Sequence, residues 1–152
     1  MSRGQTSLSS RVMELVTRWI RFVPSCHTRF LMGLDLLIID DNRMFQRHAR
    51  RFLDQAETDV ATIEAASDAA DGLAHAQALQ PDVILLDLSM PGAGGLDVIA
   101  DLRAAVPDAR IIVLTRHDDP LYADQALQEG ADAFVSKLHM TTDLVDEVGR
   151  TH

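Results

Sequence analysis

The segment Leu34-Asp35-Leu36-Leu37-Ile38-Ile39-Asp40-Asp41-Asn42 decides the fold class of this chain, because a short apolar run ends there in two carboxylates. A run of this length and composition predicts a strand buried on both faces, as in a parallel sheet covered by helices. Two similar runs follow along the chain: Val83–Asp87, which ends in an aspartate, and Ile111–Leu114, which ends at Thr115.

Amphipathic segments with helical periodicity alternate with these strands and with two shorter strand-like segments, Val60–Glu64 and Ala133–Ser136. Alternation of this kind indicates an α/β fold with a parallel sheet. We therefore expect a (βα)5 doubly wound, five-stranded parallel sheet. The expected helices run from a cap at Asn42 to about Glu57, from a cap at Ser67 to about Leu79, from Leu96 to Val106, from Pro120 to Glu129 with Gly130 at its end, and from a cap at Thr141 or Thr142 through Leu144, Val145 and Val148.

The most informative polar residues stand at the ends of these strands. Because the carboxyl ends of parallel strands meet at one edge of the sheet, where open α/β folds bind ligands, we expect these side chains to lie together. Lys137 is the only lysine among 14 basic residues, which suggests that its position requires an amine. The residues are Asp40, Asp41, Asp87, Thr115 and Lys137.

This set of side chains suits the chemistry of a phosphoryl group. Three carboxylates that converge on one point repel one another, so they need a cation among them, and oxygen ligands suit Mg2+. An ammonium and a hydroxyl would complete the groups that position and neutralise a transferred phosphoryl group. The chain contains neither GxxxxGKS/T nor GxGxxG. We therefore expect the phosphoryl group to come from a partner protein or a small acyl phosphate, not from ATP bound by this chain.

Four stretches, in order and at family-like spacing, carry a resemblance to a known family. Residues 33–149 resemble the receiver domain of two-component response regulators, which has a flavodoxin-like fold, and we assign this domain to residues 33–152. The detail around Met90-Pro91-Gly92 is most similar to receivers that precede helix-turn-helix DNA-binding domains. The four stretches are Leu36-Leu37-Ile38-Ile39-Asp40-Asp41-Asn42, Ile84-Leu85-Leu86-Asp87-Leu88-Ser89-Met90-Pro91-Gly92, Ile112-Val113-Leu114-Thr115 and Gly130-Ala131-Asp132-Ala133-Phe134-Val135-Ser136-Lys137.

The resemblance implies a role for each residue that matches a family motif. Asp87 resembles the phosphoacceptor, and Lys137 resembles the lysine that pairs with the phosphoryl group. Asp40 and Asp41 resemble the acidic pair that holds Mg2+ together with Asp87 and the backbone carbonyl two residues later, here that of Ser89.

The resemblance also implies a conformational switch. Thr115 resembles the hydroxyl that moves onto the phosphoryl group, and Phe134 resembles the aromatic residue that swings inward with it, which remodels the face formed by the fourth helix, the fifth strand and the last helix. The chain departs from the family at Arg116, where a small residue is usual. Ser89, His117 and Arg116 are the residues we expect to tune dephosphorylation.

Residues 1–32 differ in charge from the rest of the chain, with a net charge of +4 against −13 for residues 33–152, within an overall charge of −9. This basic N-terminal extension is compatible with a short helix that touches a membrane surface or a partner, or docks on its own domain. The interpretation we favour is a start-site artefact, with translation from Met32. Charges interrupt every apolar window of about 20 residues, so we expect no membrane span.

The expected partners are a histidine kinase or phosphotransfer protein and a downstream protein target, and homodimerisation stays open. The acidic composition argues against direct nucleic-acid binding by this chain, because such binding needs a cationic surface. A single cysteine, Cys26, fits a reducing compartment, and we expect a cytoplasmic protein.

Other functions remain as alternatives. Arg116 beside Thr115 keeps open a phosphorylation-independent scaffold, and the similarity to helix-turn-helix-linked receivers keeps open a truncated DNA-binding transcriptional regulator. A haloacid-dehalogenase-like phosphohydrolase would need a second aspartate two residues after the first, but Asn42 stands there relative to Asp40. We expect no enzyme activity beyond self-phosphorylation from acyl phosphates and autodephosphorylation.

Overall fold

A computed structural model describes residues 33–152 of this chain except 57, 92–94, 117–119, 140–143, 145, 146, 149, 151 and 152. The expectations for residues 1–32, for His117 and for a cap at Thr141 or Thr142 therefore lie outside the described residues. Among the helices that are described, none combines the length and the hydropathy that crossing a bilayer requires.

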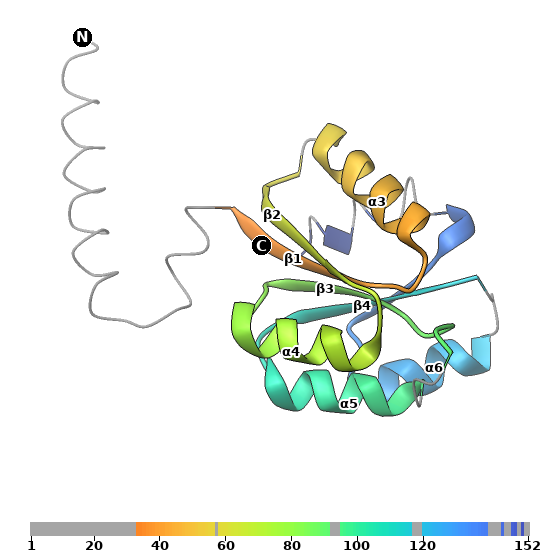
Figure 1. Cartoon of the computed structure of the whole chain (residues 1–152). Helices are drawn as coiled ribbons and strands as arrows, with labels where there is room; N and C mark the ends of the chain where they lie inside the picture. The colour runs from red at the N-terminus through yellow and green to blue at the C-terminus, as the bar shows by residue number, and fades with distance from the viewer. Residues whose placement is uncertain are drawn as a thin grey trace, which may run out of the picture. The chain divides into compact units, whose positions relative to one another are not determined.

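Five parallel strands form one sheet in the order β2-β1-β3-β4-β5 (Figure 1). This arrangement confirms the expected five-stranded α/β fold. The apolar runs that suggested buried strands lie at the centre of the sheet, where every residue of β3 is buried. The strands are β1 (Leu34–Ile39), β2 (Val60–Ala66), β3 (Val83–Asp87), β4 (Arg110–Thr115) and β5 (Ala133–Ser136).

Helices cover both faces of the sheet, with α3 on one face and α4, α5 and α6 on the other (Figure 1). Successive residues of a strand point to opposite faces. Leu37 and Ile39 therefore join the apolar cluster under α4–α6, and Leu36 and Ile38 join the cluster under α3. The described helices are α3 (Arg43–Gln55), α4 (Ala69–Leu79), α5 (Leu96–Ala105), α6 (Pro120–Gln128) and the 3-10 turn η1 (Lys137–His139).

Side-chain caps fix where two of the helices begin. Asn42 caps α3 as expected, because its side-chain oxygen accepts from the amides of Met44 and Phe45 at 3.0 and 3.1 Å. The expectation that Ser67 caps the next helix is wrong. Asp68 is the cap of α4, and its carboxylate accepts from the amide of Asp71 at 2.7 Å.

Gly130 ends α6 in the left-handed conformation that the sequence suggested, with φ +113°. The Gly130 amide donates to the carbonyl of Leu127 at 3.2 Å, and the Ala131 amide donates to that of Ala126 at 3.0 Å. This pair of bonds is a Schellman motif, which turns the chain sharply towards β5.

Most element boundaries lie within one or two residues of those expected. β2 continues to Ala66 because its ladder with β1 extends to the pair Ile39–Ala66. β4 begins at Arg110 because this residue pairs with Val83 at the start of β3.

Arg103 of α5 ties several segments together at the end of the sheet where β4 and β5 begin. Its guanidinium donates to the carbonyls of Pro107, Ala109 and Gly130 at 3.0, 2.7 and 2.7 Å. It also forms an ion pair with Asp132 at 2.6 Å. One side chain thus connects the end of α5 with the segments that lead into β4 and β5.

Candidate functional site

Buried polar groups gather at the carboxyl ends of the central strands. Among the described residues, the buried polar or charged ones are Asp40, Asp87 and Thr115, with exposed fractions of 1%, 3% and 1%. Asp40 directly follows β1, and Asp87 and Thr115 end β3 and β4. A buried carboxylate is costly unless it is paired, so this end of the sheet requires cationic partners.

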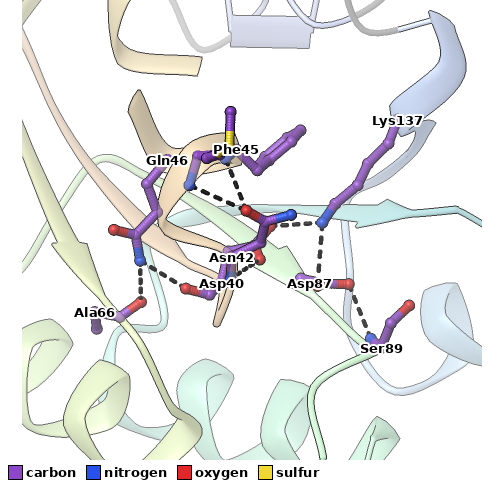
Figure 2. Close-up of polar contacts among 9 residues, drawn as sticks. Asp40, Asn42, Phe45, Gln46, Ala66, Asp87, Ser89 and Lys137 are labelled. Carbon is purple, nitrogen blue, oxygen red and sulfur yellow. Dashed lines mark hydrogen bonds and ion pairs between the residues drawn. The ribbon is translucent and has the colours of Figure 1, made fainter. Parts of the chain in front are cut away.

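Lys137 supplies the cationic partner for both buried carboxylates. Its Nζ lies 2.6 Å from Oδ2 of Asp40 and 3.1 Å from Oδ2 of Asp87, and its side chain is only 6% exposed. Figure 2 shows the side chain reaching from the turn after β5 towards the ends of β1 and β3. The only lysine of the chain therefore bridges two of the aspartates that the sequence placed beside it.

Backbone amides orient the other oxygen of each carboxylate. Oδ1 of Asp40 accepts from the amide of Asn42 at 2.8 Å, and Oδ1 of Asp87 accepts from the amide of Ser89 at 2.9 Å (Figure 2). In each aspartate, one carboxylate oxygen thus accepts from a backbone amide two residues on, and the other oxygen contacts Lys137. Both carboxylates are held in fixed orientations before any ligand arrives.

The pKa of Asp40 is raised above its ordinary value of 3.8, chiefly because burial disfavours the charged carboxylate. Repulsion from Asp87 acts in the same direction. The Lys137 ammonium and the amide of Asn42 lower this pKa, and they offset the effect of burial only in part. Further positive charge beside Asp40 would favour its ionised form.

Asp41 adds a third, exposed carboxylate to this group. One oxygen each from Asp40, Asp41 and Asp87 lies within 4.8 Å of the others, a spacing that could hold a metal ion. Three carboxylates and the Lys137 ammonium leave two net negative charges, which a divalent cation would balance. Hard oxygen donors with one exposed side fit Mg2+, which retains water ligands when it binds to proteins.

The sequence analysis did not assign Phe45 and Gln46 to the site, although both contact it. Nε2 of Gln46 donates to the carbonyls of Asp40 and Ala66 at 2.6 and 3.0 Å, which joins the ends of β1 and β2 (Figure 2). The ring of Phe45 lies beneath the Lys137 ammonium, with Nζ 4.1 Å from the ring centroid. The available signal was their position in the first turn of the helix that follows the acidic pair.

The remaining expected site residues differ in their surroundings. Thr115 pairs with Ser136 in the β4–β5 ladder, and Phe134 of β5 is half-buried against the apolar cluster under α4–α6. Ser89 and Arg116 are exposed. The structure thus brings Asp40, Asp41, Asp87 and Lys137 together at the end of the sheet where Thr115 also lies, and His117 is outside the described residues.

Comparison with known proteins places this geometry among signalling domains. Residues 36–149 match the response regulator receiver domain family. The chain is 34% identical over 112 residues to the nitrate/nitrite response regulator protein NarL of Escherichia coli (strain K12), covering 72% of this chain and 50% of that protein. It is 31% identical over 108 residues to the uncharacterized transcriptional regulatory protein YxjL of Bacillus subtilis (strain 168), covering 71% and 50%. The chain thus spans about half the length of these curated relatives.

Solved structures give the same result. A response regulator from Burkholderia pseudomallei, with a phosphorylated aspartic acid, calcium ion and citrate, matches with a TM-score of 0.67 at 31% identity, covering 74% of this chain and 65% of that one. The receiver domain of the putative response regulator NarL from Mycobacterium tuberculosis matches with a TM-score of 0.64 at 30% identity, covering 76% and 96%. These matches confirm the resemblance that the four sequence motifs indicated.

Proposed function

This chain belongs to the response regulator receiver domain family, and on that premise we propose that it is a phosphoacceptor module whose phosphorylated residue is Asp87. The phosphoryl group comes from a partner histidine kinase or phosphotransfer protein, or from a small acyl phosphate. The observation that carries the proposal is the bridge from Lys137 Nζ to Asp40 and Asp87, 2.6 and 3.1 Å long, inside a group of three carboxylates.

In the transfer step, an oxygen of the Asp87 carboxylate attacks phosphorus and forms the new O–P bond. The bond from phosphorus to the donor breaks, and its electron pair leaves with the imidazole or the carboxylate of the donor. Lys137 already lies 3.1 Å from Asp87, so its charge is in place to neutralise the oxygens of the incoming phosphoryl group. The amide of Ser89 holds the other oxygen of Asp87 and limits rotation of the nucleophile.

Asp40, Asp41, Asp87 and the backbone carbonyl of Ser89 are the groups that would hold Mg2+. When bound, the ion would neutralise charge on the phosphoryl oxygens. The two net negative charges of the group and the exposed Asp41 support this assignment.

The proposed response to phosphorylation involves Thr115 and Phe134. Thr115 ends β4 at the same edge of the sheet as Asp87 and can supply a hydroxyl donor to a phosphoryl oxygen. Phe134 lies on the neighbouring strand, half-buried on the face covered by α6, where its movement would change the surface that a downstream partner contacts. The lifetime of the phosphorylated state is proposed to depend on three residues: Ser89 and Arg116, which are exposed, and His117. We place this signalling in the cytoplasm.

Intact-mass analysis after incubation with acetyl phosphate tests the proposal. We expect one phosphoryl adduct on the wild type that requires Mg2+ and is absent from Asp87→Asn. Asp101→Asn, which changes an exposed aspartate of α5, should carry the adduct normally. A folded wild type without an adduct, or an adduct that persists in Asp87→Asn, would contradict the proposal and favour a phosphorylation-independent scaffold.

A second candidate function concerns the protein as a whole. The chain spans about half of relatives that are transcriptional regulatory or response regulator proteins, which favours a receiver that controls transcription through an attached DNA-binding domain. Sequencing the transcript and measuring the mass of the protein isolated from its source would test this candidate. A mass equal to that of 152 residues would exclude it in favour of a receiver that acts through protein contacts.

A further inference from the structure

We propose that Phe45 is a positioning residue for the phosphoryl-transfer site, because its ring lies against the Lys137 ammonium that bridges Asp40 and Asp87. This inference rests on the proposed function and deepens it. It begins from one contact, the 4.1 Å separation between Lys137 Nζ and the centroid of the Phe45 ring.

An ammonium group has three N–H donors and no acceptor. Among the described residues, Asp40 and Asp87 are the carboxylates that Lys137 Nζ contacts, at 2.6 and 3.1 Å, and Phe45 is the aromatic ring that it contacts. The Lys137 side chain is 6% exposed, so bulk water has little access to it. A cation held over a ring face in such a desolvated position is attracted by the ring quadrupole more strongly than at an exposed surface.

Phosphorylation and Mg2+ binding together would change two of these three partners and leave the third unchanged. Asp87 becomes an acyl phosphate and loses its carboxylate charge, and Asp40 gains a competing cation when Mg2+ is bound. The ring of Phe45 is not a ligand for Mg2+ and does not react. Phe45 is therefore the partner that can hold Lys137 in the same place before, during and after the transfer.

The backbone of Phe45 is itself fixed by the residues of the site. Its amide donates to Oδ1 of Asn42 at 3.1 Å, and the amide of Asn42 donates to Oδ1 of Asp40 at 2.8 Å. Asp40 in turn binds Lys137, so Asp40, Asn42, Phe45 and Lys137 form a closed circuit of contacts (Figure 2). The N-terminal cap of α3 thus helps to fix the position of the Phe45 ring relative to the Lys137 ammonium.

Nuclear magnetic resonance can observe this contact directly, because Lys137 is the only lysine in the chain. Protein labelled with 13C-lysine should give one set of lysine signals. Its ε-methylene protons should be shifted upfield in the wild type by the ring current of Phe45. The shift should persist in Phe45→Tyr and disappear in Phe45→Leu. A wild type without an upfield shift would overturn the proposed contact.

The rate of Asp87 phosphorylation by acetyl phosphate and Mg2+ tests the function of the contact. Phe45→Leu keeps an apolar side chain but removes the ring, and we expect the rate to fall about five-fold, while Phe45→Tyr restores it. Phe52→Leu is the matched control. Phe52 lies on the same helix and packs, half-buried, against the same apolar cluster, so its truncation should leave the rate unchanged.

The outcomes separate this inference from the proposed function. An adduct on the wild type that forms at the same rate in Phe45→Leu would overturn the inference alone. Equal losses in Phe45→Leu and Phe52→Leu would overturn it as well, because they would indicate a general effect of helix packing. A folded wild type that forms no adduct on Asp87 would overturn both. Urea unfolding of each variant, followed by circular dichroism, ensures that the rates compare folded proteins.

Discussion

Burial and ion pairing act in opposite directions on the Asp40 carboxylate. Burial and Asp87 raise its pKa above 3.8, whereas Lys137 and the Asn42 amide lower it, and burial is the larger effect. Without Mg2+, the folded state therefore binds the proton of Asp40 more tightly than the unfolded state does. Protonation of Asp40 stabilises the fold, and ionisation of Asp40 destabilises it.

We predict how Asp40 changes stability with pH in Mg2+-free buffer. The unfolding free energy of the wild type, minus that of Asp40→Asn, should fall as the pH rises from 3.8 through the raised pKa of Asp40. The amide of the variant has one acceptor oxygen, so it can accept from Asn42 or from Lys137 but not from both, as the carboxylate does. The loss of this acceptor changes stability by an amount that does not follow the titration of Asp40, so the pH trend of the difference reports that titration. Urea titrations of both proteins over this pH range provide the measurement. A difference that grows with pH would mean that the ion pair with Lys137 outweighs burial.

At the level of residues, the sequence could predict the charged part of the site and not its aromatic part. Asp40, Asp87 and Lys137 were identifiable because each stands at the end of a predicted strand, and parallel strands bring such positions together. Phe45 was assignable only to the apolar face of its helix. Its contact with Lys137 depends on how far α3 reaches over the sheet, and helical periodicity carries no information on that distance.

At the scale of elements, a glycine lets α4 lie close against β1. A Cβ on Gly72 would come within 2.6–2.9 Å of the Ile39 side chain, closer than real Cβ contacts allow. Glycine is normally unfavourable in the middle of a helix, by about 1 kcal/mol relative to alanine. At position 72, packing between α4 and β1 therefore favours glycine, whereas helix propensity favours alanine.

We predict that Gly72→Ala lowers the unfolding free energy by up to about 2 kcal/mol, because overpacking costs about 1–3 kcal/mol and the gain in helix propensity offsets about 1 kcal/mol of it. Ala74→Gly, at an exposed position of the same helix, should lower it by about 1 kcal/mol through propensity alone. Chemical denaturation measures both. An increase in stability for Gly72→Ala would show that α4 can move away from Ile39.

The sequence predicted the type and order of the described strands and helices because their periodicities are strong and glycine or proline residues separate them. It predicted Ser67 as the cap of α4 where the structure has Asp68, since both side chains can accept from an amide three residues on. The choice depends on where β2 ends, and β2 continues to Ala66 through its ladder with β1. Cross-strand pairing, which is not local in sequence, therefore decided the boundary.

At the scale of the whole domain, stability and chemistry depend on opposite ends of the sheet. The acidic group and Lys137 occupy the end where the strands finish, and Arg103 connects segments at the end where β4 and β5 begin. The ring of Phe45, the carboxylates and the amides that orient them all belong to the first of these ends.

We predict that Arg103→Met lowers the unfolding free energy by about 2–3 kcal/mol, because four acceptors lose a charged donor. Its rate of Asp87 phosphorylation should equal that of the wild type at a temperature where both are folded. Arg150→Met is the control, since this side chain is 67% exposed and its removal should change stability by less than about 0.5 kcal/mol. A slower phosphorylation in Arg103→Met would show that the two ends are coupled.

The strand order also has a mechanical consequence. β3 is hydrogen-bonded to β1 on one side and to β4 on the other, so the backbone that leads to Asp87 is held on both sides. β5 has four residues and is hydrogen-bonded to β4 alone, so fewer hydrogen bonds hold it in the sheet than hold β3. Under the proposed function, we therefore expect phosphorylation of Asp87 to displace β5 more easily than β3, because hydrogen bonds to neighbouring strands hold β5 on one side and β3 on both.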